Sequence, residues 1–140
     1  MSAQIQEVLQ KMRLDYVANL PQRLDAIEAM VRALGPGNAP EDNCDNLHRA
    51  VHSLKGTAGT YGVAIISTVC RPFEDYVESF LEDYASAGDA QIRTCMCFID
   101  LLRRAQEQVA AGRESFPDIE ASLASISGIA LPAPSGPAAT

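Results

Sequence analysis

Apolar residues recur along most of this chain three or four residues apart, which is the spacing of one face of an α-helix. The pattern predicts helices over about 3–34, 40–61, 64–86 and 89–111, and a short further helix over 117–127. Neither an alternating strand pattern nor an internal repeat stands out. The sequence therefore predicts an all-α fold, an antiparallel four-helix bundle with an additional N-terminal helix and a candidate C-terminal helix.

Prolines and glycines indicate where these helices bend or end. Pro21 removes a backbone donor inside the first helical pattern, so we expect a kink or a short break there, and Pro72 should bend the third helix. Gly62 should end the second helix in the left-handed conformation. The chain finishes in LPAPSGPAAT, which is small and proline-rich. We therefore expect a helical domain over 1–127 and a flexible tail or linker over 128–140.

The segment LHRAVHSLKGTAGTYG, residues 47–62, divides into two faces when it is drawn as a helix. The apolar face, which should enter the core, comprises Leu47, Val51, Leu54, Ala58 and Tyr61. The polar side carries His48, His52, Gly56 and Gly59, flanked by Arg49 and Lys55. Glycine within a helix costs roughly 1 kcal/mol relative to alanine, so two glycines on a wet face suggest that another molecule approaches closely there.

Composition narrows the classes of function. The chain has 140 residues, enough for one domain, and a net charge of −7 with a pI of about 4.7. That charge argues against a nucleic-acid partner, because phosphate binding needs a broad basic surface. The N-terminal sequence has no apolar signal core, and no apolar run approaches the ~18 residues of a membrane span, so we expect no membrane association.

Four cysteines bear on compartment and metal binding: Cys44, Cys70, Cys95 and Cys97. None forms a CxxC pair, and the last two lie in an apolar run where buried thiols are common. A reducing cytoplasm is the simplest compartment for such a chain.

Several readings of His52 are open from the residues alone. A lone histidine is most often plain surface. Zinc could use Cys44, His48 or His52, but the ends of that row lie ~12 Å apart along a helix and zinc–ligand bonds are only ~2.0–2.3 Å long. A hydrolase is disfavoured because Ser53 points about 100° away from His52 and no GxSxG motif exists. We therefore expect no metal on this chain.

The remaining reading makes His52 a nucleophile toward phosphorus. Neutral imidazole is available near pH 7 because its reference pKa is about 6.5. A phosphoryl group on the ring would add negative charge, which Lys55 and Arg49 could offset. The bare helix at Gly56 and Gly59 would admit the active-site loop of a partner. Such an exchange needs mainly positioning and charge neutralisation, so a small bundle could perform half of it.

The motif RAVHSLKGTA, residues 49–58, followed by Gly62 closely resembles the signature of histidine phosphotransfer (HPt) domains, and the resemblance extends over roughly residues 5–110. It implies a helical bundle whose exposed histidine takes a phosphoryl group from a receiver-domain aspartate and passes it to another. By this resemblance His52 is phosphorylated, Lys55 stabilises the phosphoryl group, and Gly56 leaves room for the receiver. Arg49, Gly59 and His48 would then belong to the partner surface.

The phosphotransfer domain of chemotaxis-type histidine kinases is a close cousin of this pattern. The cousin's orienting glutamate corresponds to Glu74, and Arg71, one turn earlier, could also face His52. The resemblance implies that the partners are receiver domains and a (hybrid) histidine kinase. It implies no cofactor on this chain, with Mg²⁺ on the receiver instead. It also implies that this chain has no kinase activity of its own and is a monomer. The alternative is the phosphoacceptor domain of a larger chemotaxis-type kinase, phosphorylated in trans by its ATP-binding domain.

Overall fold

The computed structural model describes residues 2–35, 40–79 and 88–130, and this part of the chain is helical without a strand. Its helices are α1 (Ala3–Arg32), α2 (Pro40–Thr60), α3 (Ala64–Glu78), α4 (Asp89–Ala110) and α5 (Pro117–Ala130). The predicted all-α fold is confirmed. Of the tail predicted over 128–140, residues 128–130 belong to α5, so it does not begin at 128, and residues 131–140 lie outside the described residues.

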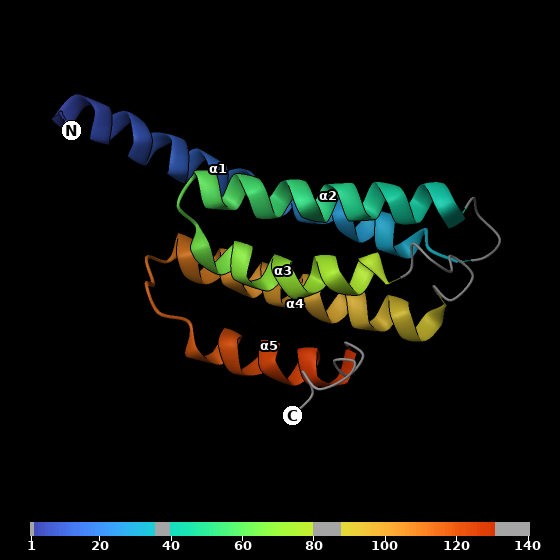
Figure 1. The fold of residues 1–140 in the computed structure, drawn as a ribbon. Coiled ribbons are helices and arrows are strands. Elements are labelled where there is room, and N and C mark those ends of the chain that lie inside the picture. Colours follow the sequence, from blue (N-terminus) through green and yellow to red (C-terminus); the bar gives the residue numbers. More distant parts are fainter. Residues whose placement is uncertain (1, 36–39, 80–87, 131–140) are drawn as a thin grey trace, which may run out of the picture.

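Successive helices run in opposite directions and form an antiparallel bundle (Figure 1). Helix α2 packs on α3, α1 packs on α4, and the contacts of α1 with α2 and of α3 with α4 close the ring of four. Helix α5 lies outside this ring against α4 and α3. It supplies the C-terminal helix that the sequence predicted and extends three residues past its predicted end at 127.

Large apolar side chains from every helix fill the space between the helices. The rings of Phe73 and Phe98 stack across α3 and α4 with their centroids 5.0 Å apart. The apolar face predicted for residues 47–61 points inward, since Leu47, Val51 and Leu54 have no exposed surface. The largest fully buried side chains are Phe73, Phe98, Leu20, Leu24, Leu47, Leu54, Ile66, Ile99, Leu101, Leu102 and Ile119.

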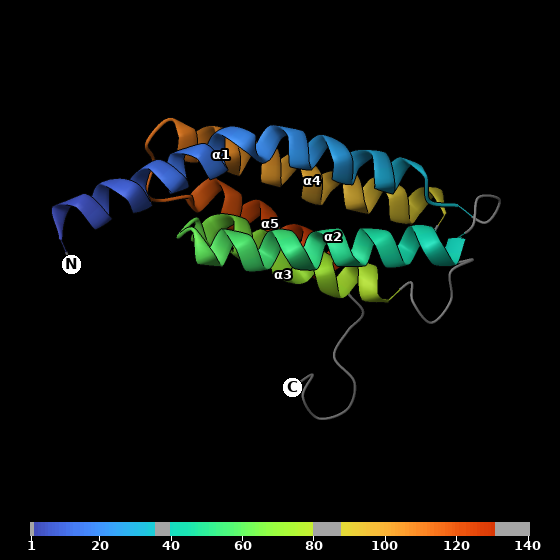
Figure 2. The ribbon, with the colours of Figure 1, turned by 90° about the horizontal axis from the view of Figure 1, so that it is seen from above.

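Helix α1 is longer than the bundle and projects from one end of it (Figure 2). The Ser2 hydroxyl accepts a hydrogen bond from the Ile5 amide and begins the helix. The helix then continues through Pro21, so the predicted short break is wrong. The additional N-terminal helix is thus the first part of α1, and the part after Tyr16 belongs to the bundle.

Gly62 ends α2 as predicted. Its φ of 73° is the left-handed conformation, and the Val63 amide donates to the Ala58 carbonyl at 2.8 Å, which closes the helix end. The short turn that follows brings α3 back along α2. Helix α3 passes through Pro72 and ends at Glu78, so it is shorter than the predicted 64–86, of which 80–86 lie outside the described residues.

Candidate functional site

His52 lies in the middle of α2, on the side away from the core. Val51, the residue before His52, and Leu54, two residues after it, are both buried, and the helix geometry consequently turns His52 outward. The side chain is 65% exposed. The imidazole is therefore open to solvent and to another protein.

A carboxylate from α3 holds one edge of this ring. His52 Nδ1 lies 3.1 Å from Glu74 Oε1 and 3.0 Å from Glu74 Oε2. Glu74 is only 9% exposed and is the buried charged residue of the described core. Burial raises the pKa of Glu74, but the hydrogen bonds from Lys55 and His52 outweigh burial and hold its pKa below the usual 4.5.

The state of Glu74 determines where the imidazole carries its proton. An ionised carboxylate only accepts hydrogen bonds, so Nδ1 of His52 must be the donor. In a neutral imidazole the second nitrogen, Nε2, then keeps its lone pair. The contact between His52 and Glu74 thus selects the tautomer in which Nε2 is free to act as a nucleophile. Carboxylates that accept a hydrogen bond from a metal-binding histidine fix its tautomer in the same way.

Lys55 shares the same carboxylate. Its Nζ lies 2.7 Å from Glu74 Oε1, and its side chain is 31% exposed. The backbone carbonyl of Lys55 also accepts a hydrogen bond from the Ser67 hydroxyl of α3 at 2.8 Å. Lys55 and His52 are therefore placed by one helix and fixed by contacts to the next, with the ammonium group one helical turn from the imidazole.

The two glycines of α2 differ in their surroundings. A Cβ added at Gly56 would meet nothing within 4 Å, so the helix surface beside His52 is open. A Cβ at Gly59 would lie 3.7 Å from the Ser67 hydroxyl, an ordinary contact with α3. Gly56 is the one that leaves free space at the histidine, whereas Gly59 lies where α2 passes α3.

Arg49, His48 and Arg71 were also predicted to lie near His52. Arg49 and Arg71 are exposed, and within the described residues neither has a hydrogen bond or ion pair to His52. His48 is half-buried, and its Nε2 is covered and has no hydrogen-bond partner in the described part of the chain. The expectation that His48 lies on the wet face is therefore wrong, because α2 turns that side chain partly into the bundle.

A polar cluster between α1 and α2 was not predicted. The Tyr16 hydroxyl lies 2.9 Å from Thr57 Oγ1, and Arg23 Nη1 donates to the same oxygen at 2.9 Å. Arg23 Nη2 reaches the hydroxyl of Ser53, the residue after His52, at 3.5 Å. Helical periodicity assigns each residue to a face but does not show which distant residue lies opposite, so sequence reasoning missed this cluster.

The other chemical readings find no support in the geometry. Cys44 is fully buried while His52 is exposed, so the two cannot share a metal ion. Across the described residues, no three His, Cys, Asp or Glu side chains gather as metal ligands.

None of the helices in the described part of the chain has the length and hydropathy of a membrane span.

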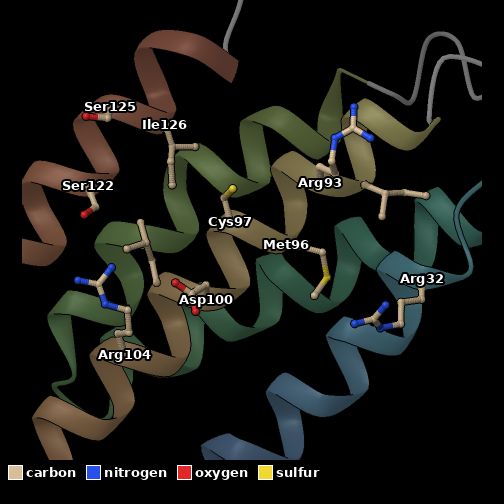
Figure 3. A pocket seen from close by; sticks show the side chains of 11 residues that line it. Arg32, Arg93, Met96, Cys97, Asp100, Arg104, Ser122, Ser125 and Ile126 are labelled. Atoms are coloured by element: carbon tan, nitrogen blue, oxygen red, sulfur yellow. The ribbon is translucent and has the colours of Figure 1, made fainter.

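A hollow of about 760 Å³ lies away from the histidine, over α4 between the end of α1 and α5 (Figure 3). Met96, Cys97 and Ile126 line it, with arginines at its rim (Arg32, Arg93 and Arg104). Within the described residues, none of its lining residues has a hydrogen bond or ion pair to His52, Lys55 or Glu74.

An exposed histidine on a helical bundle, oriented by a carboxylate and beside a lysine, is the arrangement that the sequence resemblance implies for a phosphoryl carrier. The family model of the Hpt domain matches residues 11–123. The chain belongs to the Hpt domain family, whose members perform histidine phosphotransfer in phosphorelays. This match does not separate the chemotaxis-type domains from other members. No curated protein and no solved structure matches the chain significantly.

Proposed function

We propose that this chain is a phosphorelay intermediate that accepts a phosphoryl group on His52 from a response-regulator receiver aspartate and passes it on. The observation that carries the proposal is the 65% exposed imidazole whose Nδ1 faces the Glu74 carboxylate. The family match supports the same assignment.

The transfer uses the lone pair of His52 Nε2. That nitrogen attacks the phosphorus of the aspartyl phosphate, the N–P bond forms, and the P–O bond to the aspartate breaks with its electron pair leaving on the carboxylate. The ring becomes positively charged while Nδ1 keeps its proton, and Glu74 at 3.0 Å stabilises that charge. The reverse sequence returns the phosphoryl group to another receiver.

Lys55 offsets the charge of the transferred group. Phosphorylation places close to two negative charges on the helix surface, one turn from its ammonium group. Lys55 then has two acceptors, Glu74 and the phosphoryl oxygens, within reach of one flexible side chain. Gly56, and beyond it Gly59, allow the receiver loop to approach the helix, and Arg49 lies at the edge of the same surface.

The partners in this proposal are receiver domains and a histidine kinase, hybrid or separate. The receiver contributes the Mg²⁺, and this chain holds no cofactor and no kinase site of its own. We place the phosphotransfer domain at 1–130, since α5 continues three residues past the predicted end at 127, and the chain in the cytoplasm, where its four free cysteines stay reduced. The second candidate, the phosphoacceptor domain of a chemotaxis-type kinase, is favoured by the Glu74–His52 contact, which matches the orienting glutamate of that group.

Phosphotransfer profiling tests the proposal. The purified chain is incubated with each phosphorylated receiver of the source cell, and in parallel with ATP and an isolated chemotaxis-type kinase domain. We expect acid-labile, base-stable label on His52 from a receiver, and none on His52→Gln, whose fold circular dichroism verifies. Label only from the kinase domain would favour the second candidate. Label that persists in His52→Gln would refute both.

A further inference from the structure

The first turns of α1 carry an apolar stripe that nothing in the described chain covers. Every large hydrophobic side chain that is exposed in the described residues lies between positions 5 and 14. Four of them are spaced three, one and three residues apart on one helix face: Ile5, Val8, Leu9 and Met12. The fifth, Leu14, falls on the opposite face, since it is nine residues after Ile5 and so about 180° away.

This stripe continues the core-facing side of α1. Tyr16, four residues after Met12, lies on the same face, is only 8% exposed and stacks on Tyr61, the residue after α2, with ring centroids 4.9 Å apart. The bundle ends near this point, and α1 projects past it (Figure 2). The uncovered stripe therefore faces the space directly beyond the end of the bundle, where a further helix could pack.

We infer that a second copy of this chain covers the stripe, through an antiparallel pair of α1 helices, whereas the sequence resemblance implied a monomer. The stripe is symmetric about a point between Val8 and Leu9, so a two-fold axis there sets Ile5 against Met12 of the other copy and Val8 against Leu9. One surface thus provides both halves of a closed, isologous contact.

Geometry selects the antiparallel direction. The stripe lies on the side of α1 that faces the bundle, so a parallel partner helix would continue into the space that α2 and α4 already occupy. An antiparallel partner instead carries its own bundle away from the first. Its Ile5 would then approach a hollow of about 380 Å³ that Leu9 and Met12 form with Tyr61 at the end of α2.

Charge and area fit a weak pair. In this register each charged residue of the segment lies opposite a glutamine of the other copy, so no like charges meet. The pairs are Glu7 with Gln10, Lys11 with Gln6, and Arg13 with Gln4. Four side chains per copy bury less than the ~800 Å² per partner of a standard stable interface. We therefore expect half-dissociation at about 10–100 µM. His52 lies in the middle of α2, away from the pair, and stays accessible in both copies.

Sedimentation equilibrium of the full chain over a concentration series tests the association. Leu9→Glu should weaken dimerisation at least tenfold, because it puts two carboxylates at the two-fold axis. Leu14→Glu is the matched control, since Leu14 is 54% and Leu9 47% exposed on the same helix. The control should associate like the natural chain. A monomer at every concentration up to about 1 mM, or equal loss in both variants, would overturn the inference.

Disulfide trapping tests the direction in a Cys97→Ser background, which removes the exposed native thiol. A mixture of Ile5→Cys and Met12→Cys chains should cross-link between the two variants, and neither should do so alone. Cross-linking of Ile5→Cys with itself would indicate a parallel pair and overturn the register. If the natural chain instead stayed monomeric and Leu9→Glu reduced its binding to a receiver, the stripe would be a receiver-binding surface, and the inference of a second copy would be wrong.

Discussion

Glu74 is the residue on which two other side chains of the site depend. Its carboxylate accepts from His52 on one side and from Lys55 at 2.7 Å on the other, and it is nearly buried while doing so. A buried carboxylate with two donors loses more on neutralisation than an exposed one. The site is therefore coupled, in the folded chain, to the ionisation of one α3 residue.

Glu74→Gln should lower stability at neutral pH but not in acid. The folded chain holds the pKa of Glu74 below 4.5, so its contribution is present above that pH and disappears as the pH falls through the lowered value. We expect the variant to be about 1–2 kcal/mol less stable near pH 7 and to converge with the natural chain as the pH falls below that lowered pKa. Urea unfolding across pH measures the difference. Hydrogen bonds from Arg103 and from Gln108 also lower the pKa values of Glu28 and Asp118, but these contributions cancel because both chains keep those residues. A pH-independent difference would contradict the ionised Glu74.

Lys55→Met should slow phosphotransfer without unfolding the chain. Loss of the ammonium group leaves the phosphoryl charge unpaired, and we expect at least about a tenfold lower transfer rate from a receiver. The matched control is Lys11→Met, since Lys11 is the chain's other lysine and lies on the projecting part of α1. Equal rates in the two variants would show that Lys55 serves the fold alone.

The sequence predicts the site residues that lie on one helix, but not those that other helices bring to it. His52, Lys55 and Gly56 follow from one helix face and one motif, because all three belong to α2. Glu74 was predicted only from the family resemblance, because its contact with His52 joins two helices and spans 22 positions of the sequence. Arg23 has no local signal at all, because its partner Thr57 lies 34 positions away and only the packing of α1 on α2 brings them together.

Among the elements, α2 shows most clearly how function opposes helix stability. Two of its residues are glycines in regular helix, where alanine is better by about 1 kcal/mol. Neither position excludes a methyl group, since Gly56 has open space and Gly59 only an ordinary contact. The helix would thus be more stable without them, which indicates a requirement outside the fold.

Gly56→Leu tests that requirement. The open surroundings should accept the side chain with no loss of stability, while the receiver should lose access to His52, so transfer should fall at least about tenfold. Asn46→Leu, at an exposed position nearly three turns earlier on α2, controls for added apolar surface. Thermal unfolding and the transfer rate are measured together. A folded Gly56→Leu that transfers at the natural rate would remove the docking role of this glycine.

Helix α5 is the element whose importance the sequence understated. Its apolar pattern is short and predicted only a candidate helix, yet Ile119 is fully buried and Leu123 is 9% exposed. Ile119→Ala should therefore cost about 2–4 kcal/mol of unfolding free energy, as for other core truncations. Ile126→Ala, at a half-buried position of the same helix, should cost clearly less. Chemical denaturation compares them, and equal small losses would mean that α5 is peripheral.

For the whole molecule, the apolar pattern predicted the bundle but not where it stops. The same spacing runs through α1 from Ile5 to Val31, yet Val31 is buried and Ile5 is exposed. Burial depends on how far the neighbouring helices extend, and periodicity carries no information about that. The kink or short break expected at Pro21 was likewise read from one helix in isolation.

The thiols report on the integrity of the whole bundle. Burial raises the pKa of Cys70 and of Cys95 to about 12 and also raises that of Cys44, so these thiols are protected by both low ionisation and lack of access. Cys97, predicted to be buried with Cys95, is exposed because two positions along a helix turn it to the other side.

Titration of the folded chain with a thiol reagent near pH 8 should therefore modify Cys97 quickly, and Cys97→Ser should abolish that phase. The three core cysteines lie on α2, α3 and α4, so each becomes reactive only when the bundle opens. Their modification should follow global unfolding, with a common rate that rises with urea. If one of them reacted much earlier than the other two, its helix would be opening separately, and the bundle could not be the single cooperative unit that holds Glu74 against His52.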